Sequence, residues 1–281
     1  MFATETKIQI ARALSSIVLA GRKLTGQPEH VTVVRRGITW SLDLKEGIDF
    51  AIFLLGGFEV RTLNRYARLV RDGDVVLDIG ANIGAHTLPL AQLVGASGKV
   101  ISFEPTANAF GKQLANIALN PELSTRIQAN QMMLMSSVEG ELPSSIYSSW
   151  PLERANDLHE EHLGRLMPTD GASMSTVDLF VGGLGGRVDF VKLDVDGNEL
   201  EVLRGATNLI STSRPKIMLE LAPYVYAEDP AKFDEILHIL WNNDYRLWSI
   251  ESKNELPRSP ELVRKAIPQR GGMNVLAEPR A

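Results

Sequence analysis

The chain has 281 residues, of which 44% are hydrophobic and 22% are charged; these fractions are typical of a globular protein and argue against a disordered, collagenous or coiled-coil chain. Its 29 basic and 34 acidic residues give a net charge of −5, which disfavours nucleic acid as a partner because phosphate backbones attract basic surfaces. Cysteine is absent, which excludes disulfides, thiol nucleophiles and thiolate zinc sites. Because no apolar run is long enough to span a bilayer, we expect a cytoplasmic protein without a transmembrane segment.

Apolar residues at helical spacing predict a first helix near the N-terminus. Basic residues separate them and no continuous apolar core forms, so the segment does not have the pattern of a signal peptide. We interpret it as an amphipathic helix that packs on the domain, and a helix that binds a membrane surface or a partner is the alternative. The apolar positions are Ile10, Leu14, Ile17, Val18 and Leu24.

A β-hairpin is expected next. Residues 31 to 60 contain the stretch VTVV, the turn RRG and the alternating stretch ITWSLDL, a pattern typical of two antiparallel strands. We therefore predict an N-terminal helix and β-hairpin cap over residues 1–60 and a main domain over residues 61–281.

From Asp74 onward, short apolar strands alternate with helical stretches, which is the pattern of a parallel sheet covered on both faces. The late stretches YRLWSI and MNVLAEP are expected to include an antiparallel pair at one edge. The sequence therefore predicts an α/β fold with a doubly wound, mostly parallel sheet. The earlier strands are DVVLDIG, KVISFEP, RIQANQ, VDFVKLDV and PKIMLEL.

Residues 136–176 interrupt this rhythm with serine-rich and proline-containing sequence. Loops of this length inside a compact α/β domain are commonly lids or binding segments. This one lies on the ligand-binding side of the predicted sheet. We predict a lid insertion here, in which Tyr147, Trp150, His159 and Arg165 would mostly decide what the site binds; anchoring the loop to the core is an alternative role of Trp150.

Acidic residues end several of the predicted strands. In an open α/β sheet, ligands bind beyond the carboxyl ends of the strands. A purely structural sheet gains nothing from like charges gathered at that edge, because they destabilise one another. The acidic edge therefore indicates a functional site, formed by Asp78, Glu104, Asp194 and Glu220.

The first of these strands leads into the loop from Gly80 to Gly84. A dinucleotide fingerprint fails there because Asn82 occupies the second glycine position, where its side chain would obstruct a pyrophosphate. A cofactor without a pyrophosphate needs only tight turns at the two glycines and backbone N–H groups for a carboxylate. S-adenosyl-L-methionine meets this description, since Glu104 can accept hydrogen bonds from ribose hydroxyls and the acidic edge suits sulfonium and ammonium charges.

With these motifs in place, the sequence resembles the FkbM-type S-adenosylmethionine-dependent methyltransferases over roughly residues 31 to 278. The resemblance implies a class I Rossmann-like fold with a seven-stranded sheet, and O-methylation of a hydroxyl on a sugar, polyketide or other small metabolite. The chain departs from the common family pattern at Asp196-Gly197-Asn198, where Glu-Gly-His is usual, and at His86, where an aromatic residue is usual. The matching stretches are RRGITWSLDL, GGFEVRTL, VVLDIGANIGAHTL, VISFEPTANAF, STVDLF, VDFVKLDVDGNELEVLRGA and PKIMLEL.

The resemblance, together with the glycine loop and the acidic strand ends, predicts one set of cofactor-binding residues. Among them, the resemblance implies that the glutamate of GGFEVRTL closes over the cofactor. The set is Glu59, Asp78, Gly80, Ala81, Asn82, Gly84, His86, Thr87, Glu104, Pro105 and Asp194.

Methyl transfer from a sulfonium is an in-line displacement, so the protein mainly aligns the acceptor oxygen, the methyl group and the sulfur. A protonated hydroxyl is a poor nucleophile, and we therefore expect a general base. Asp194 is the leading candidate, and orienting the amino group of the cofactor is its alternative role. Glu220 and Glu199 follow as catalytic candidates, although Glu199 could instead stabilise the positive end of its own helix.

Two patterns raise the question of a metal. Asp194, Asp196 and Glu220 carry the oxygen ligands that Mg²⁺ prefers, but carboxylate spacing alone does not separate ligands from helix caps, so Mg²⁺ is the less favoured reading. His159 and His162 are three positions apart, whereas a zinc protease helix needs four, and we interpret them as part of a solvated helix face. We assign no metal-binding residues.

Two other functions remain open at this point. One is an NAD-dependent oxidoreductase, which Asn82 disfavours. The other is a catalytically silent protein that binds S-adenosylmethionine without transferring its methyl group. The expected partner is a small-molecule hydroxyl acceptor, and the oligomeric state is open.

Overall fold

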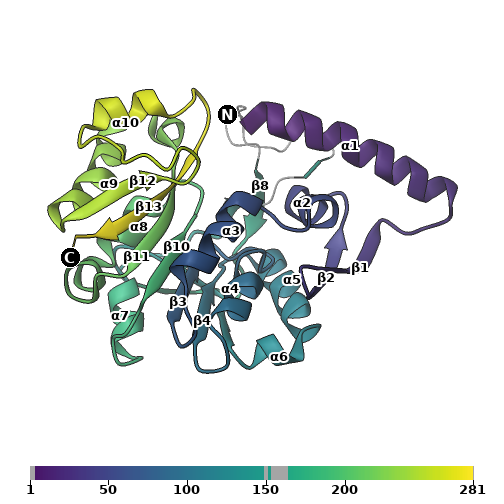
Figure 1. The fold of residues 1–281 in the computed structure, drawn as a ribbon, viewed down its shortest axis with the longest axis horizontal. Coiled ribbons are helices and arrows are strands. Elements are labelled where there is room, and N and C mark those ends of the chain that lie inside the picture. The colour runs from purple at the N-terminus through teal and green to yellow at the C-terminus, as the bar shows by residue number, and fades with distance from the viewer. Residues whose placement is uncertain (1–3, 149–150, 153–163, 281) are drawn as a thin grey trace.

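A computed structural model of the chain describes residues 4–148, 151–152 and 164–280 (Figure 1). Its central element is a seven-stranded sheet in the order β12-β13-β11-β10-β3-β4-β5. Strands β11, β10, β3, β4 and β5 run parallel, and β13 runs antiparallel to both β11 and β12. This arrangement confirms the predicted doubly wound, mostly parallel fold. The strands are β3 (Val75–Ile79), β4 (Lys99–Phe103), β5 (Ile127–Asn130), β10 (Phe190–Leu193), β11 (Lys216–Leu221), β12 (Tyr245–Ser249) and β13 (Met273–Pro279).

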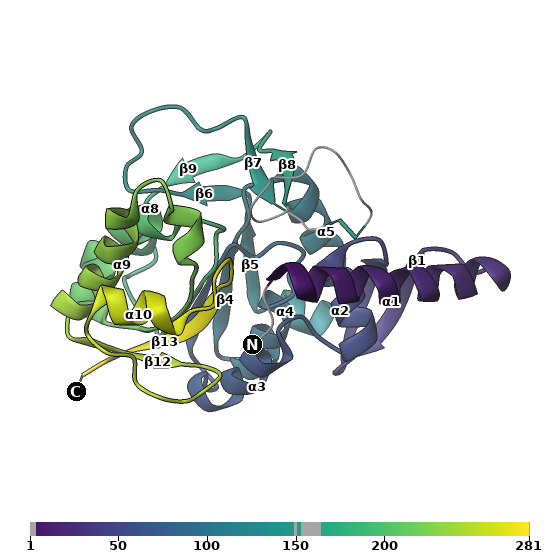
Figure 2. The same ribbon diagram turned by 90° about the horizontal axis from the view of Figure 1, so that it is seen from above.

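Helices cover both faces of this sheet (Figures 1 and 2). Neighbouring residues of a strand point to opposite faces, so Val76 packs in one apolar cluster with Leu88, and Leu77 packs in the other with Leu203. Both faces are thus buried, which explains why the strands are apolar throughout. The helices are α3 (Val60–Leu69), α4 (Thr87–Leu93), α5 (Ala107–Ala118), α6 (Pro121–Ser124), α7 (Val177–Gly182), α8 (Glu199–Arg204), α9 (Pro230–Asn242) and α10 (Pro260–Ala266), with a π-helical turn at Leu209–Ser213 and a 3-10 turn at Pro223–Tyr226.

The N-terminal part contains a long helix, a hairpin and a short helix: α1 (Thr4–Leu24), β1 (His30–Arg35), β2 (Ile38–Asp43) and α2 (Gly47–Leu55). Strands β1 and β2 pair antiparallel around the turn RRG, with Arg35 opposite Ile38. The hairpin shares a core with the main sheet, because Trp40 and Leu42 lie in the same apolar cluster as Leu88. The boundary at residue 60 therefore stays a prediction, since packing is continuous across it.

Helix α1 contacts the rest of the molecule through a different face from the one its apolar spacing suggested. Ile17 and Leu24 are 70% and 88% exposed, and Ile10 and Leu14 are also exposed. The inward face is formed by Ala11, Val18 and Leu19, which pack against the apolar cluster, and by Ser15, whose hydroxyl donates to the carbonyl of Leu44 at 3.0 Å. The helix thus packs on the domain and also leaves an apolar stripe in solvent.

The predicted lid segment, residues 136–176, contains the short strands β7, β8 and β9, and β6 directly precedes it (Figure 2). Strands β6 (Met132–Leu134) and β9 (Ser173–Ser175) pair parallel, and β7 (Ser145–Ser148) and β8 (Arg165–Pro168) pair antiparallel. Trp150 and the stretch from His159 to His162 lie outside the described residues. Among the described helices, none combines the length and apolar character that crossing a membrane requires.

Candidate active site

A pocket with about 760 Å³ of empty space lies at the carboxyl ends of β3, β4 and β10. The lid strand β7 also contributes to its wall. Seven of the expected cofactor-binding residues line it: Gly80, Ala81, Asn82, His86, Glu104, Pro105 and Asp194. Glu59, Asp78, Gly84 and Thr87 do not line it.

The glycine loop owes its shape to the close approach of β10. At Gly80 the φ angle is +81°, and a Cβ atom there would lie 1.8 Å from the carbonyl oxygen of Asp194. Only glycine fits such a position. Asn82 also has a left-handed φ of 48°, so the loop turns sharply and directs the backbone N–H of Asn82 to Glu104 Oε2 at 2.9 Å.

Glu104 follows β4 directly and forms one wall of the pocket. Its other carboxylate oxygen accepts a hydrogen bond from the backbone N–H of Thr106 at 2.9 Å. The side chain is 3% exposed, and burial raises the pKa of Glu104 although these hydrogen bonds oppose the shift. The carboxylate is thus fixed in place before any ligand arrives.

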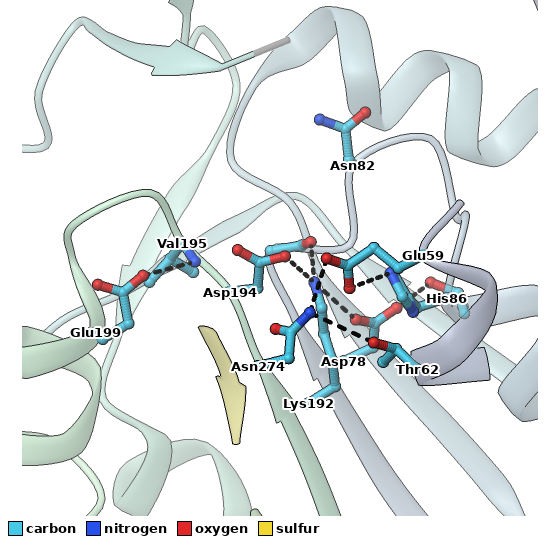
Figure 3. Close-up of polar contacts among 12 residues, drawn as sticks. Glu59, Thr62, Asp78, Asn82, His86, Lys192, Asp194, Val195, Glu199 and Asn274 are labelled. Carbon is cyan, nitrogen blue, oxygen red and sulfur yellow. Dashed lines mark hydrogen bonds and ion pairs between the residues drawn. The ribbon is translucent and has the colours of Figure 1, made fainter. Parts of the chain in front are cut away.

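Lys192 ties the carboxyl ends of β3 and β10 together in the pocket lining (Figure 3). Its ammonium donates to the Gly80 carbonyl at 2.8 Å and lies 3.4 Å from Asp194 Oδ2 and 3.7 Å from Asp78 Oδ1. Burial alone would lower the pKa of Lys192, but the neighbouring carboxylates, Asp194 first among them, outweigh it and the pKa is raised. Asp78 is itself fully buried and accepts a hydrogen bond from Thr87 Oγ1 at 2.6 Å.

The three catalytic candidates occupy different places. Asp194 lines the pocket beside Asp196, whereas Glu199 and Glu220 do not reach the lining. Glu199 accepts hydrogen bonds from the backbone N–H groups of Val195 at 3.1 Å and Gly197 at 3.2 Å, and it also accepts the hydroxyl of Tyr226 at 2.7 Å. These contacts hold the loop before α8, and the alternative role of Glu199 at the positive end of its helix stays a prediction.

Glu220 lies on β11, opposite Asn274 of β13. Burial and the charge of Asp194 raise the pKa of Glu220 well above its usual range. Burial and the same neighbour have this effect on the pKa of Asp196. The pocket therefore sits in a strongly acidic surrounding that favours a bound cation.

Glu59 and His86 complete the site from the N-terminal side. Glu59 Oε1 accepts a hydrogen bond from Asn274 at 2.8 Å, and Glu59 Oε2 lies 3.9 Å from His86 Nε2. The other ring nitrogen of His86 lies 2.9 Å from the hydroxyl of Tyr66. Burial raises the pKa of Glu59 and lowers the pKa of His86 well below its usual range.

Sequence reasoning missed several residues of this arrangement, namely Lys192, Tyr66, Asn274 and Tyr226. Lys192 had a signal, because a lysine inside the apolar strand VDFVKLDV is costly to bury unless it is paired. The other three had none, since each contributes through a contact with a distant segment. Within residues 4–148, 151–152 and 164–280, no group of three or more histidine, aspartate and glutamate side chains is arranged to hold a metal ion.

The order of the strands in the seven-stranded sheet and the position of the pocket at their carboxyl ends are those of the class I methyltransferase fold. The Methyltransferase FkbM domain matches residues 78–247 of the chain, and the protein belongs to this family. The expected family membership is thereby confirmed.

Two relatives match part of the chain. The hexuronic acid methyltransferase AglP of Haloferax volcanii is 29% identical over 148 residues, which cover 50% of this chain and 53% of the relative. The methyltransferase sdnD of Sordaria araneosa is 31% identical over 157 residues, which cover 46% and 59%. The chain thus matches somewhat more than half the length of these relatives. A solved structure, the methyltransferase FkbM of Methylobacillus flagellatus, is similar with a TM-score of 0.45 and 18% identity, over 79% of this chain and 48% of that one.

Proposed function

We propose that the protein transfers the methyl group of S-adenosylmethionine to a hydroxyl group of a small-molecule acceptor, such as a sugar or polyketide. The observation that carries this proposal is a pocket that joins the glycine loop, Glu104 and Asp194 in one acidic surrounding. When bound, S-adenosylmethionine supplies an electrophilic methyl group on a sulfonium. The chemistry left to the protein is binding, alignment and removal of a proton.

The donor set fits this cofactor. Glu104 presents a fixed carboxylate, which suits the two hydroxyls of a ribose, and the apolar side chains of Phe103, Met132 and Leu134 nearby in the pocket suit the flat face of an adenine. Asp194 provides negative charge for an ammonium or sulfonium. NAD remains disfavoured, because the side chain of Asn82 lines the pocket where a pyrophosphate would have to approach.

Asp194 is the group we assign as general base. It lines the pocket and is held by Lys192 at 3.4 Å, so its carboxylate is oriented and can accept the proton of an acceptor hydroxyl. Glu199 and Glu220 act in this proposal as supports and not as bases, since neither lines the pocket. A sugar acceptor has the additional support that the relative AglP is named for a hexuronic acid.

The test combines binding with turnover. Calorimetric titration with S-adenosylmethionine, S-adenosylhomocysteine and NADH, with and without EDTA, should show binding of the first two only and no effect of EDTA. Asp194→Asn should lower kcat by about 10²- to 10⁴-fold while the affinity for S-adenosylhomocysteine changes far less. The exposed control Asp229→Asn should leave both unchanged.

Each contrary outcome has its own meaning. Equal losses of binding and turnover in Asp194→Asn would assign the residue to cofactor binding instead of proton transfer. Binding of NADH alone would overturn the proposed function. Binding of S-adenosylmethionine without transfer to any acceptor of a broad panel would favour the catalytically silent protein, and loss of binding in EDTA would reveal a metal.

A further inference from the structure

Tyr66 and His86 form a buried pair at the pocket, in which His86 belongs to the lining and Tyr66 does not. Tyr66 comes from α3 and is fully buried, and His86 precedes α4 and is 3% exposed. The tyrosine hydroxyl lies 2.9 Å from His86 Nδ1, and the two rings meet edge to face at 5.7 Å.

The surroundings of the pair determine which ring nitrogen carries the proton. Burial raises the pKa of Tyr66 well above its usual range, so the phenol keeps its proton at neutral pH. Within the described part of the chain, His86 Nδ1 is the hydrogen-bond partner of that hydroxyl. The O–H therefore donates to Nδ1, which must be unprotonated. Because burial lowers the pKa of His86, the ring is neutral and its single proton resides on Nε2.

His86 lines the pocket, and its Nε2 atom lacks a hydrogen-bond partner. It is buried, and no acceptor among the described residues lies within hydrogen-bond distance. Its nearest candidate, Glu59 Oε2, is 3.9 Å away (Figure 3), and Glu59 Oε1 is already held by Asn274. A buried N–H donor in a native structure normally has an acceptor, so a ligand in the pocket is expected to provide one.

The charges around His86 indicate which group of a ligand would accept the hydrogen bond from its Nε2. Asp194 and Glu59 make this end of the pocket negative, which suits the ammonium of an amino acid but repels its carboxylate. A neutral N–H donor can bind that carboxylate without a further charge, and the ammonium of Lys192 close by offsets part of the surrounding negative charge. The amino acid moiety of the cofactor carries both groups.

We propose that Tyr66 is a positioning residue that fixes His86 as the Nε2–H tautomer, and that this N–H donates to the carboxylate of the cofactor's amino acid moiety. The ligand part of this inference rests on the proposed function, whereas the tautomer is a property of the protein alone. The two parts are therefore tested separately.

The tautomer is measured first, by long-range ¹H–¹⁵N correlation spectra of the ligand-free protein. The His86 ring signals, assigned with the variant His86→Phe, should show a protonated Nε2 and an unprotonated Nδ1. In Tyr66→Phe the pattern should shift toward a mixture of tautomers. The matched control is Tyr245→Phe, because Tyr245 is equally buried and donates to a backbone carbonyl, that of Pro215, outside the pocket; it should leave the His86 signals unchanged.

The ligand is measured next, by titration with S-adenosylhomocysteine and with its decarboxylated analogue, which keeps the amino group. His86→Phe should weaken binding of S-adenosylhomocysteine by about 10- to 100-fold, the usual loss for a hydrogen bond to a charged group. Binding of the analogue should change little. Tyr66→Phe should show the same selectivity with a smaller loss, of about 3- to 10-fold.

A double variant separates positioning from packing. If Tyr66 acts through His86, the combination Tyr66→Phe with His86→Phe should bind S-adenosylhomocysteine no more weakly than His86→Phe alone. Additive losses would mean that Tyr66 contributes only to packing, and that result overturns the positioning role.

Three further results would overturn the inference. A protonated Nδ1 in the wild-type protein removes its premise. Equal losses for S-adenosylhomocysteine and the decarboxylated analogue in His86→Phe would show that His86 does not contact the carboxylate. Absence of any S-adenosylhomocysteine binding by the wild-type protein would refute the ligand and the proposed function together, and the spectra would then show whether the tautomer assignment stands by itself.

Discussion

At the scale of single residues, Lys192 provides the positive charge that allows several carboxylates to be buried together. Its ammonium lies within 4 Å of Asp78 and Asp194, and it lowers the pKa of Glu59 against the larger effect of burial. A buried carboxylate without a partner is strongly destabilising, because the charge has lost its hydration. Lys192 is thus a structural requirement of the acidic pocket as well as a support for Asp194.

Replacing this cation tests that requirement. Lys192→Met keeps most of the side-chain volume but leaves Asp78 fully buried and unpaired, so we expect a loss of about 3–5 kcal/mol in the free energy of unfolding. The control Lys265→Met breaks an exposed pair with Glu261 and should cost about 0.5 kcal/mol or less. Urea denaturation measures both, and similar losses in the two variants would contradict the role of Lys192.

Glu104 provides a second prediction at this scale, on binding. Glu104→Gln replaces one of two oxygen acceptors with an amide donor, which then faces the N–H group of either Asn82 or Thr106, and removes the charge that a ribose would contact. We expect S-adenosylhomocysteine to bind about 10- to 100-fold more weakly. Calorimetry against the exposed control Glu122→Gln checks this, and an unchanged dissociation constant would refute the assignment of Glu104.

At the scale of elements, two asparagines attach the hairpin to the main domain. Asn116 in α5 accepts a hydrogen bond from the backbone N–H of Ser41 at 2.8 Å. Asn120, in the turn after α5, accepts from the N–H of Thr39 at 2.9 Å and donates to its carbonyl at 2.7 Å. These side chains pair with the edge of β2 that faces away from β1, so they replace a neighbouring strand.

Removal of either amide should therefore destabilise the protein. In Asn116→Ala or Asn120→Ala, backbone groups of β2 lose their partners in a partly buried place, and we expect a loss of about 1–3 kcal/mol for each variant. Asn64→Ala, which removes an exposed hydrogen bond from Arg36, should stay within about 0.5 kcal/mol. Thermal unfolding gives the comparison, and equal midpoints for all three variants would show that the asparagines do not anchor β2.

At the scale of the whole molecule, folding buries many carboxylates without fully compensating their charge. Burial is the largest cause in each case, and it raises the pKa. A carboxyl group with a raised pKa binds more protons when folded than when unfolded, so its contribution to stability is greatest at low pH and is lost as pH rises through the folded pKa. The groups are Glu46, Asp49, Glu59, Asp78, Glu104, Asp196, Glu199 and Glu220.

The unliganded protein should consequently become more stable as the pH is lowered from about 8 to about 6. His86 acts in the opposite direction. Its pKa is lowered by burial, so the folded state loses stability once an unfolded histidine takes up a proton, near the ordinary histidine pKa of 6.5. The carboxylates outnumber it, and each kcal/mol gained should raise the melting midpoint by about 2–4 °C. Calorimetric scans across this range measure the slope, and a midpoint that falls with decreasing pH would contradict the dominance of the buried carboxylates.

The sequence by itself determined the sheet and the edge at which the pocket forms. Apolar strands that alternate with helices specify a parallel sheet, and in such a sheet the carboxyl ends of the strands lie together, which brings Glu104 and Asp194 into one pocket. Gly80 could be recognised for the same reason, because a tight turn after the first strand requires glycine. These inferences use only local pattern and a general rule of sheet geometry.

Tertiary structure alone decided which side chains meet. Glu220 ends a strand as Asp194 does, and Glu199 begins the helix α8, yet both lie outside the pocket lining, because the direction of a side chain depends on the local backbone and not on its place in the sequence pattern. Tyr66 reaches His86 from another helix, and α1 turns Ile17 to solvent while Val18 packs inward. Periodicity specifies an element and its faces, but the partner of each face is set by the packing of segments that are distant in the chain.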